Sequence, residues 1–140
     1  MADEAVIIDL LGNQGDVVEY TVSATTAIAK GELLKISASP QTAAKATAGS
    51  LFAGIAAIEK SATDGVTKMP AITHCVADLT CGAGETMTLG QPVMVGAAAN
   101  EVDVATGDTV ENTVKVVGIA LETVGNNGTG AVLVNAMKRR

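Results

Sequence analysis

Aromatic side chains are almost missing from this chain of 140 residues: Tyr20 and Phe52 are the whole set, and tryptophan does not occur. Proteins that bind single-stranded nucleic acid stack the bases on aromatic rings, and sugar rings are commonly held in the same way. The scarcity of aromatics therefore counts against both kinds of binding site. The apolar residues, 48% of the chain, are mostly Ala, Val, Ile and Leu, and β-branched side chains favour strands.

Basic residues are also few. Nine Lys and Arg stand against 15 Asp and Glu, for a formal net charge of −6, and Lys138, Arg139 and Arg140 are among the nine. Nucleic-acid binding depends on Lys and Arg to neutralise phosphates, so we expect no nucleic-acid partner. No apolar run approaches the roughly 18 to 20 residues of a membrane-spanning helix, so we expect no membrane partner either. The apolar surplus must then lie in a core or against other protein chains.

Reactive side chains are scarce as well, since the chain has one histidine, His74, and two cysteines, Cys75 and Cys81. A zinc site needs about four ligands at recognisable spacings, so we predict no metal and no cofactor. The adjacent His74 and Cys75 leave one catalytic alternative, a Cys–His pair, but small half-buried side chains of a strand explain them more simply. We predict that the protein is not an enzyme. Whether Cys75 and Cys81 form a disulfide depends on the redox state of the compartment and stays open.

Two further patterns have structural explanations. Glu101 and Asp103 are close in sequence, but without an aromatic platform they indicate a solvated acidic surface rather than the facing carboxylates of a glycosidase. The segment Gly82-Ala83-Gly84 lacks the lysine of a phosphate-binding loop. We interpret it as the turn between two similar units.

The sequence repeats itself along most of its length. Residues 28–36 (IAKGELLKI) and 87–95 (MTLGQPVMV) each contain a glycine, and each reaches an Ala-Thr pair at the same distance from that glycine. The triplet Gly-Ile-Ala recurs at 54–56 and 118–120. Each copy then reaches a turn dipeptide, Asp64-Gly65 or Asn127-Gly128, which favours a tight hairpin because its residues tolerate positive φ. We predict an internal repeat of approximately residues 26–80 and 85–137.

Short apolar strands, frequent turns and 15 glycines without a sustained helical period indicate an all-β protein. The alanine-rich stretch 43–48 is too short for more than one helical turn. The predicted fold is a compact β-barrel or sandwich built from two similar β units, with an extended N-terminal arm. The expected core residues are Leu33, Ile36, Ile55 and Ile58 in the first unit and Val93, Val95, Val117 and Ile119 in the second.

Residues 1–15 form the predicted arm, and residues 16–140 form the barrel-like domain. The arm has a short apolar run that ends in the turn-forming segment Gly12-Asn13-Gln14-Gly15. The run has no helical pattern of its own, so we expect it to be extended or to dock on another surface.

The repeated segments resemble the capsid decoration (cement) proteins of tailed bacteriophages. Residues 26–36 (TAIAKGELLKI), followed by 52–56 (FAGIA), are similar to that family's I-x-x-G-x-L-V strand and the G-V-A strand after it. Residues 87–95 and 118–122 (GIALE) are similar to the later segments V-x-x-G-x-x-V-x-V and G-x-A-L-E. The arm and residues 75–81 lie outside this pattern.

The resemblance implies a β-barrel-like virion protein on the outer surface of the phage head. Such proteins commonly form homotrimers, bind the major capsid protein and stabilise its lattice. Strand addition to a sheet edge of the capsid would suit the apolar run of the arm. The expected capsid-binding residues are Val6, Ile7, Ile8, Leu10 and Leu11.

Two other functions remain as alternatives. The first is a β-barrel module that binds a glycan or a host surface, which the lack of aromatics disfavours. The second is an enzyme that uses His74 and Cys75.

Overall fold

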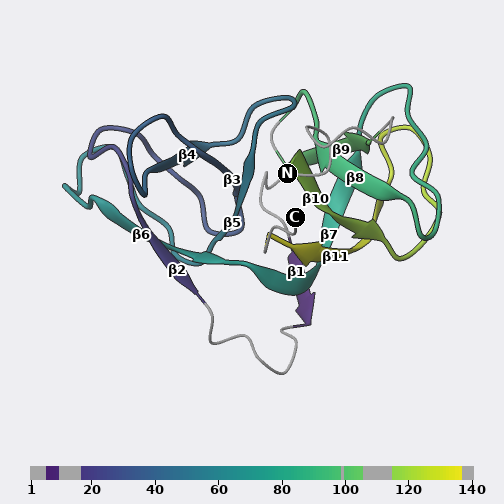
Figure 1. Ribbon diagram of the computed structural model, residues 1–140, viewed down its shortest axis with the longest axis horizontal. Coiled ribbons are helices and arrows are strands. Elements are labelled where there is room, and N and C mark those ends of the chain that lie inside the picture. The colour runs from purple at the N-terminus through teal and green to yellow at the C-terminus, as the bar shows by residue number, and fades with distance from the viewer. Residues whose placement is uncertain (1–5, 10–16, 99, 106–114, 137–140) are drawn as a thin grey trace.

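The computed structural model of the chain describes residues 6–9, 17–98, 100–105 and 115–136, and for residues 6–9 the backbone alone. These ranges form eleven β-strands (Figure 1). No helix within them is both long and apolar enough to cross a membrane. The strands are β1 (Val6–Asp9), β2 (Val18–Thr21), β3 (Leu33–Ile36), β4 (Ala43–Lys45), β5 (Phe52–Ala56), β6 (Lys68–Ile72), β7 (His74–Cys81), β8 (Pro92–Val95), β9 (Glu101–Val104), β10 (Val116–Ala120) and β11 (Thr129–Asn135).

The strands form two sheets with the same strand order. The first sheet runs β2-β6-β5-β3-β4, and the second runs β7-β11-β10-β8-β9, with β1 added to the edge of β7. A parallel pairing of β7 with β9 closes the second sheet into a five-stranded barrel, barrel 2. A parallel bridge between Thr21 and Thr42 joins β2 to the start of β4 in the same way, so we call the first sheet barrel 1. The predicted all-β fold with two similar units is confirmed.

The repeat extends to the irregularities of the strands. Leu34 pairs with Gly54 between β3 and β5, and Val93 pairs with Gly118 between β8 and β10. The register of both strand pairs, β3–β5 and β8–β10, shifts immediately beside the paired glycine. Such bulges bend a strand and increase its twist, which helps a small sheet to curl into a barrel.

The glycine at each bulge is required by the neighbouring strand. A Cβ on Gly54 would lie 2.9 Å from the carbonyl oxygen of Ile72, and Gly54 has φ +147°. A Cβ on Gly118 would overlap the carbonyl oxygen of Leu133. The Gly-Ile-Ala triplet visible in both halves of the sequence therefore marks a close approach to the backbone of the neighbouring strand.

Each barrel has an apolar interior, and the two interiors differ in size. The interior of barrel 1 is lined by Val22, Ile28, Leu34, Ala43, Ala53, Ala56, Met69 and Ala71. The larger cluster fills barrel 2 with Cys75, Ala77, Leu79, Cys81, Met87, Val93, Val95, Val102, Val117, Ala120, Val132 and Val134, and it includes Leu33, Phe52 and Ile55 from barrel 1. The outer face of β3 and β5 is thus buried as part of the second core.

This outer face covers one end of barrel 2, the end at which β8 finishes and β9 and β10 begin. The N–H of Leu33 donates to Oδ1 of Asn100, just before β9, at 2.8 Å. The N–H of Gly49 donates to the carbonyl oxygen of Val95, at the end of β8, at 3.1 Å. The two barrels are therefore joined by an apolar contact with hydrogen bonds around it.

Five of the eight predicted core residues are buried, and three are not. The buried ones are Leu33, Ile55, Val93, Val95 and Val117. Ile36, Ile58 and Ile119 are 41%, 43% and 44% exposed. The pleat gives the reason for Ile119: its neighbours Gly118 and Ala120 are buried on β10, so Ile119 points outward.

Two local predictions, the tight hairpins and the boundary between the units, differ from the structure. The dipeptides Asp64-Gly65 and Asn127-Gly128 lie within longer connections between β5 and β6 and between β10 and β11, not in two-residue hairpins. Residues 43–45, for which the sequence allowed at most one helical turn, form β4. β7 pairs within the second sheet, so Gly82-Ala83-Gly84 is a turn inside the second unit, and the unit boundary falls at Thr73.

Candidate functional site

The N-terminal strand β1 lies on the edge of barrel 2. It pairs antiparallel with β7, with Val6 opposite Asp78 and Ile7 opposite Ala77. One edge of β1 is thus paired with the chain's own β7. β1 ends the strand order, so the described strands leave its outer edge unpaired. Of the predicted capsid-binding residues, Val6, Ile7 and Ile8 belong to β1, while Leu10 and Leu11 lie outside the described residues.

His74 and Cys75 do not form a pair. They are neighbours on β7, where buried and half-buried residues alternate. Cys75 is fully buried and belongs to the interior cluster of barrel 2, whereas His74 lies on the outside. Burial raises the pKa of the Cys75 thiol to about 11, which disfavours the nucleophilic thiolate. The strand geometry therefore argues against the catalytic alternative.

The two cysteines are also too far apart to bond with one another. Cys75 and Cys81 are both free and buried, near opposite ends of β7. An extended strand separates such positions by about 20 Å, whereas bridged cysteines have Cα atoms within about 7 Å. The local disulfide left open by the sequence does not form in this fold.

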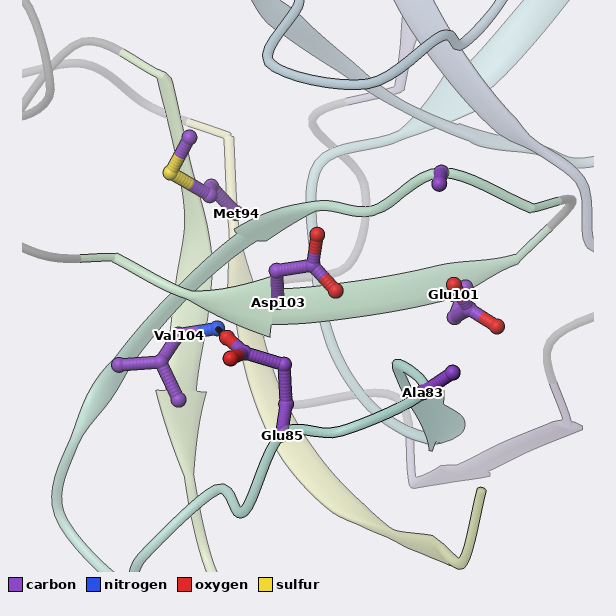
Figure 2. A pocket seen from close by; sticks show the side chains of 7 residues that line it. Ala83, Glu85, Met94, Glu101, Asp103 and Val104 are labelled. Carbon is purple, nitrogen blue, oxygen red and sulfur yellow. Dashed lines mark hydrogen bonds between the residues drawn. The ribbon is translucent and has the colours of Figure 1, made fainter. Parts of the chain in front are cut away.

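An acidic hollow lies on the outside of barrel 2, beside β8 and β9 (Figure 2). Its lining includes three carboxylates, Glu85, Glu101 and Asp103. Two of them bind backbone: Glu85 Oε1 accepts from the N–H of Val104 at 3.0 Å, and Glu101 Oε1 accepts from the N–H of Ala98 at 3.3 Å. Among the described residues no group of three or more His, Cys, Asp or Glu is arranged to hold a metal ion.

The third carboxylate of this hollow, Asp103, lies in unfavourable surroundings. Partial burial raises the pKa of its carboxyl, and the negative charges of Glu85 and Glu101 raise it further. Asp103 also lies against Gly82, where a Cβ would overlap its Oδ1. Glycine at that position therefore leaves room for the carboxylate.

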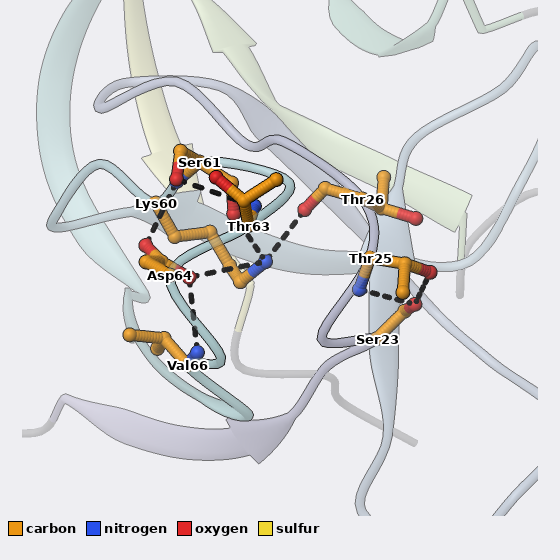
Figure 3. A network of polar contacts seen from close by, with 8 residues as sticks. All are labelled: Ser23, Thr25, Thr26, Lys60, Ser61, Thr63, Asp64 and Val66. Carbon is orange, nitrogen blue, oxygen red and sulfur yellow. Dashed lines mark hydrogen bonds and ion pairs between the residues drawn. The ribbon is translucent and has the colours of Figure 1, made fainter.

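A buried lysine closes one end of barrel 1 (Figure 3). The side chain of Lys60 is fully buried, and its Nζ donates to the carbonyl oxygens of Thr26 at 2.7 Å and Ser61 at 3.1 Å. Asp64 Oδ1 lies 3.9 Å away. Hydrogen bonds from the N–H groups of Val66 and Ser61, together with the charge of Lys60, lower the pKa of Asp64. The ammonium thus orders the loop between β5 and β6.

Sequence reasoning missed Lys60 and Asn100, two of the four buried polar residues among those that the structure describes. Lys60 follows the apolar run 51–58. Its equivalent in the second repeat is Val124, because Ile28 bridges to Lys60 as Met87 bridges to Val124. Only this equivalence marks Lys60 as an interior position. Asn100 precedes β9 with φ +56°. Asparagine tolerates this conformation, which is a signal for a turn but not for burial.

No protein-family model matches this sequence, and no curated protein matches it. Solved structures with a similar fold include a phage protein. It is the N base of the head fiber protein gp8.5 of bacteriophage phi29, with a TM-score of 0.54 and 17% sequence identity. The similarity covers 89% of this chain and 98% of that chain. Both barrels are thus included, and the likeness establishes the fold.

Proposed function

We propose that this protein is a structural component of a phage head that decorates the outer capsid surface and stabilises the lattice of the major capsid protein. The observation that carries the proposal is the fold shared with a head fiber base over nearly all of both chains. The resemblance of residues 26–36 and 87–95 to decoration proteins is independent support, because it comes from the sequence alone. A homotrimer is the proposed assembly.

The chemistry of the described surface suits a binding role that needs no reaction. The only histidine is separated from the buried thiols by the pleat of β7. In the acidic hollow, the carboxylates of Glu85 and Glu101 accept hydrogen bonds from backbone N–H groups. Many weak contacts per particle stabilise a shell through multivalency, so a single copy does not need high affinity.

Sedimentation with phage heads tests this function directly. Purified protein is mixed with undecorated heads of the cognate phage, the heads are pelleted, and bound protein is measured against concentration. We expect saturation at a fixed number of copies per head and a higher temperature of head disruption. Heads that pellet without the protein at any concentration would refute the proposal.

The arm is the proposed capsid contact, and its contribution can be separated from its role in folding. Deleting residues 1–11 removes β1 and exposes the edge of β7 at Val76–Asp78. An unpaired strand edge promotes aggregation. The double variant Leu10→Ser/Leu11→Ser keeps β1 and removes apolar side chains beyond it. We expect the deletion to abolish binding to heads and the double variant to weaken it at least tenfold. Unchanged affinity in both variants would exclude the arm.

A further inference from the structure

Equivalent positions in the two barrels can be identified from their hydrogen bonds. Leu33 pairs with Ile55 between β3 and β5, and Pro92 pairs with Ile119 between β8 and β10. Ile55 then pairs with Ile72 as Ile119 pairs with Leu133. The row Leu33–Ile55–Ile72 of barrel 1 thus corresponds to the row Pro92–Ile119–Leu133 of barrel 2, which we name the outer row.

The two rows have opposite surroundings. Leu33 and Ile55 are 1% and 0% exposed because their row covers the end of barrel 2. In the outer row, Pro92 is exposed and Ile119 is 44% exposed. Two more exposed leucines, Leu89 and Leu121, precede and follow these strands. The second barrel therefore presents to solvent the same apolar face that the first barrel buries.

The surface that receives such a row is also present twice. In barrel 2 it is the covered end, where Val95 is 3% exposed. The corresponding end of barrel 1 carries Val17 before β2, Ile36 at the end of β3 and Leu51 before β5, which are 43%, 41% and 40% exposed. Ile36 and Leu51 are adjacent, since the N–H of Ile36 donates to the carbonyl oxygen of Leu51 at 2.9 Å. We name these three residues the open end.

We infer that the outer row of one copy packs on the open end of a second copy and so repeats, between chains, the contact that joins the two barrels within a chain. The occupant of each surface is the complementary surface of the same protein. Within one chain, the row Leu33–Ile55–Ile72 of barrel 1 packs on the covered end of barrel 2. The outer row of barrel 2 and the open end of barrel 1 are left exposed. Continuity with the internal contact is the argument for this partner.

Such a contact is heterologous, because two different surfaces meet. A heterologous contact closes into a ring when its rotation allows and otherwise extends into a fibre. Three copies joined in this way form a ring of six barrels. The inference thus names the surfaces for the self-association in the proposed function, and a ring would present several copies of β1 to a capsid at once.

The contact between copies lacks one hydrogen bond of the internal contact. Within the chain the N–H of Leu33 donates to Asn100. Proline at the equivalent position, Pro92, has no N–H. The residue equivalent to Asn100 is Gln41, so its side-chain oxygen would face a proline that has no N–H to donate; its Nε2 donates to the carbonyl oxygen of Glu19 at 2.9 Å. The contact between copies therefore depends more on apolar packing than the internal contact does.

Two variants each remove one side of the contact, and a third is a matched control. Ile119→Glu places a charge in the outer row, and Ile36→Glu places one at the open end. Ile58 is 43% exposed, and it follows β5 at the opposite end of barrel 1 from Leu51, so Ile58→Glu changes neither surface. All three positions are already exposed to solvent, and thermal melts confirm that each variant folds.

Native mass spectrometry and light scattering then give the result. We expect the wild type and Ile58→Glu to form oligomers larger than a dimer, and each of the other variants alone to be a monomer of 14.0 kDa. An equimolar mixture of Ile119→Glu and Ile36→Glu retains one intact outer row and one intact open end. That mixture should form heterodimers of twice the monomer mass and nothing larger.

Three outcomes would overturn the inference: a monomeric wild type, oligomers that persist in either single variant, or a mixture that stays monomeric. The sedimentation assay with heads separates this failure from that of the proposed function. A monomer that saturates heads would refute the contact between copies and leave the function standing. An oligomer that shows the expected variant behaviour but does not bind heads would support the contact between copies and refute the proposed function.

Discussion

Asn100 accepts a hydrogen bond from the N–H of Leu33 through its side-chain oxygen, at 2.8 Å, across the boundary between the two barrels. Asn100 is 8% exposed, so water does not readily replace this bond. Its Nδ2 is buried without a hydrogen-bond partner. The bond fixes β3 against the start of β9 and thereby sets how barrel 1 covers barrel 2.

Replacing Asn100 with alanine should therefore destabilise the protein. The buried N–H of Leu33 would lose its acceptor, which costs about 1–3 kcal/mol. Gln41→Ala is the matched control, because Gln41 occupies the equivalent position with φ +46° and its side-chain bond is exposed. Urea unfolding measures both variants. A loss no larger for Asn100→Ala than for Gln41→Ala would show that the boundary bond contributes nothing.

Gly118 should not tolerate a side chain. A Cβ there would overlap the carbonyl oxygen of Leu133 on the neighbouring strand, and forced overpacking costs about 1–3 kcal/mol. Gly125 has no atom within 4 Å of an added Cβ, so Gly125→Ala should change stability by less than about 0.5 kcal/mol. Thermal melts of the two alanine variants test this difference. Equal melting temperatures would contradict the close approach of β10 and β11.

The sequence predicted the class of fold because its signals are local. Glycine spacing, the Gly-Ile-Ala triplet and β-branched runs recur in both halves, and each has a structural cause such as the close approach at Gly54 and Gly118. Exposure could not be predicted in the same way. Ile55 and Ile119 have the same local pattern, yet one is 0% and the other 44% exposed, because only one faces another barrel.

Long-range pairing was equally beyond local patterns. The apolar run of the arm indicated an extended segment, but its partner β7 lies far along the chain. The prediction placed β7 in the first unit, because Gly82-Ala83-Gly84 has the composition of a boundary between units. Lys60 has no sequence signal for burial, since its acceptors are backbone carbonyls of Thr26 and Ser61, and any residue supplies a carbonyl.

Lys60→Met should destabilise barrel 1 even though an apolar side chain fills the equivalent position, Val124, in barrel 2. Methionine matches the length of lysine but leaves the carbonyl oxygens of Thr26 and Ser61 without the ammonium. We expect a loss of about 1–3 kcal/mol in the free energy of unfolding. Lys30, which is exposed, supplies the control Lys30→Met, with an expected change below about 0.5 kcal/mol. A Lys60→Met variant as stable as this control would show that the ammonium is not needed.

The acidic hollow predicts how stability depends on pH. The folded-state pKa of Asp103 is raised by burial and by the charges of Glu85 and Glu101, so the folded protein holds this proton more tightly than the unfolded chain does. A raised carboxyl pKa makes folding less favourable as pH rises from the ordinary aspartate pKa, about 3.9, through the folded value. Above that window the whole penalty is present.

Asp103→Asn should consequently raise the melting temperature at pH 7 and have a much smaller effect near pH 3, where the carboxyl is protonated in both states. Added salt should narrow the difference at pH 7, because it screens the repulsion from Glu85 and Glu101. Glu59→Gln removes a charge from an exposed position on barrel 1 and serves as the control for net charge. Melting curves at both pH values decide the matter. A stabilisation by Asp103→Asn that is equally large at pH 3, or equalled by Glu59→Gln at pH 7, would rule out local repulsion in the hollow as its cause.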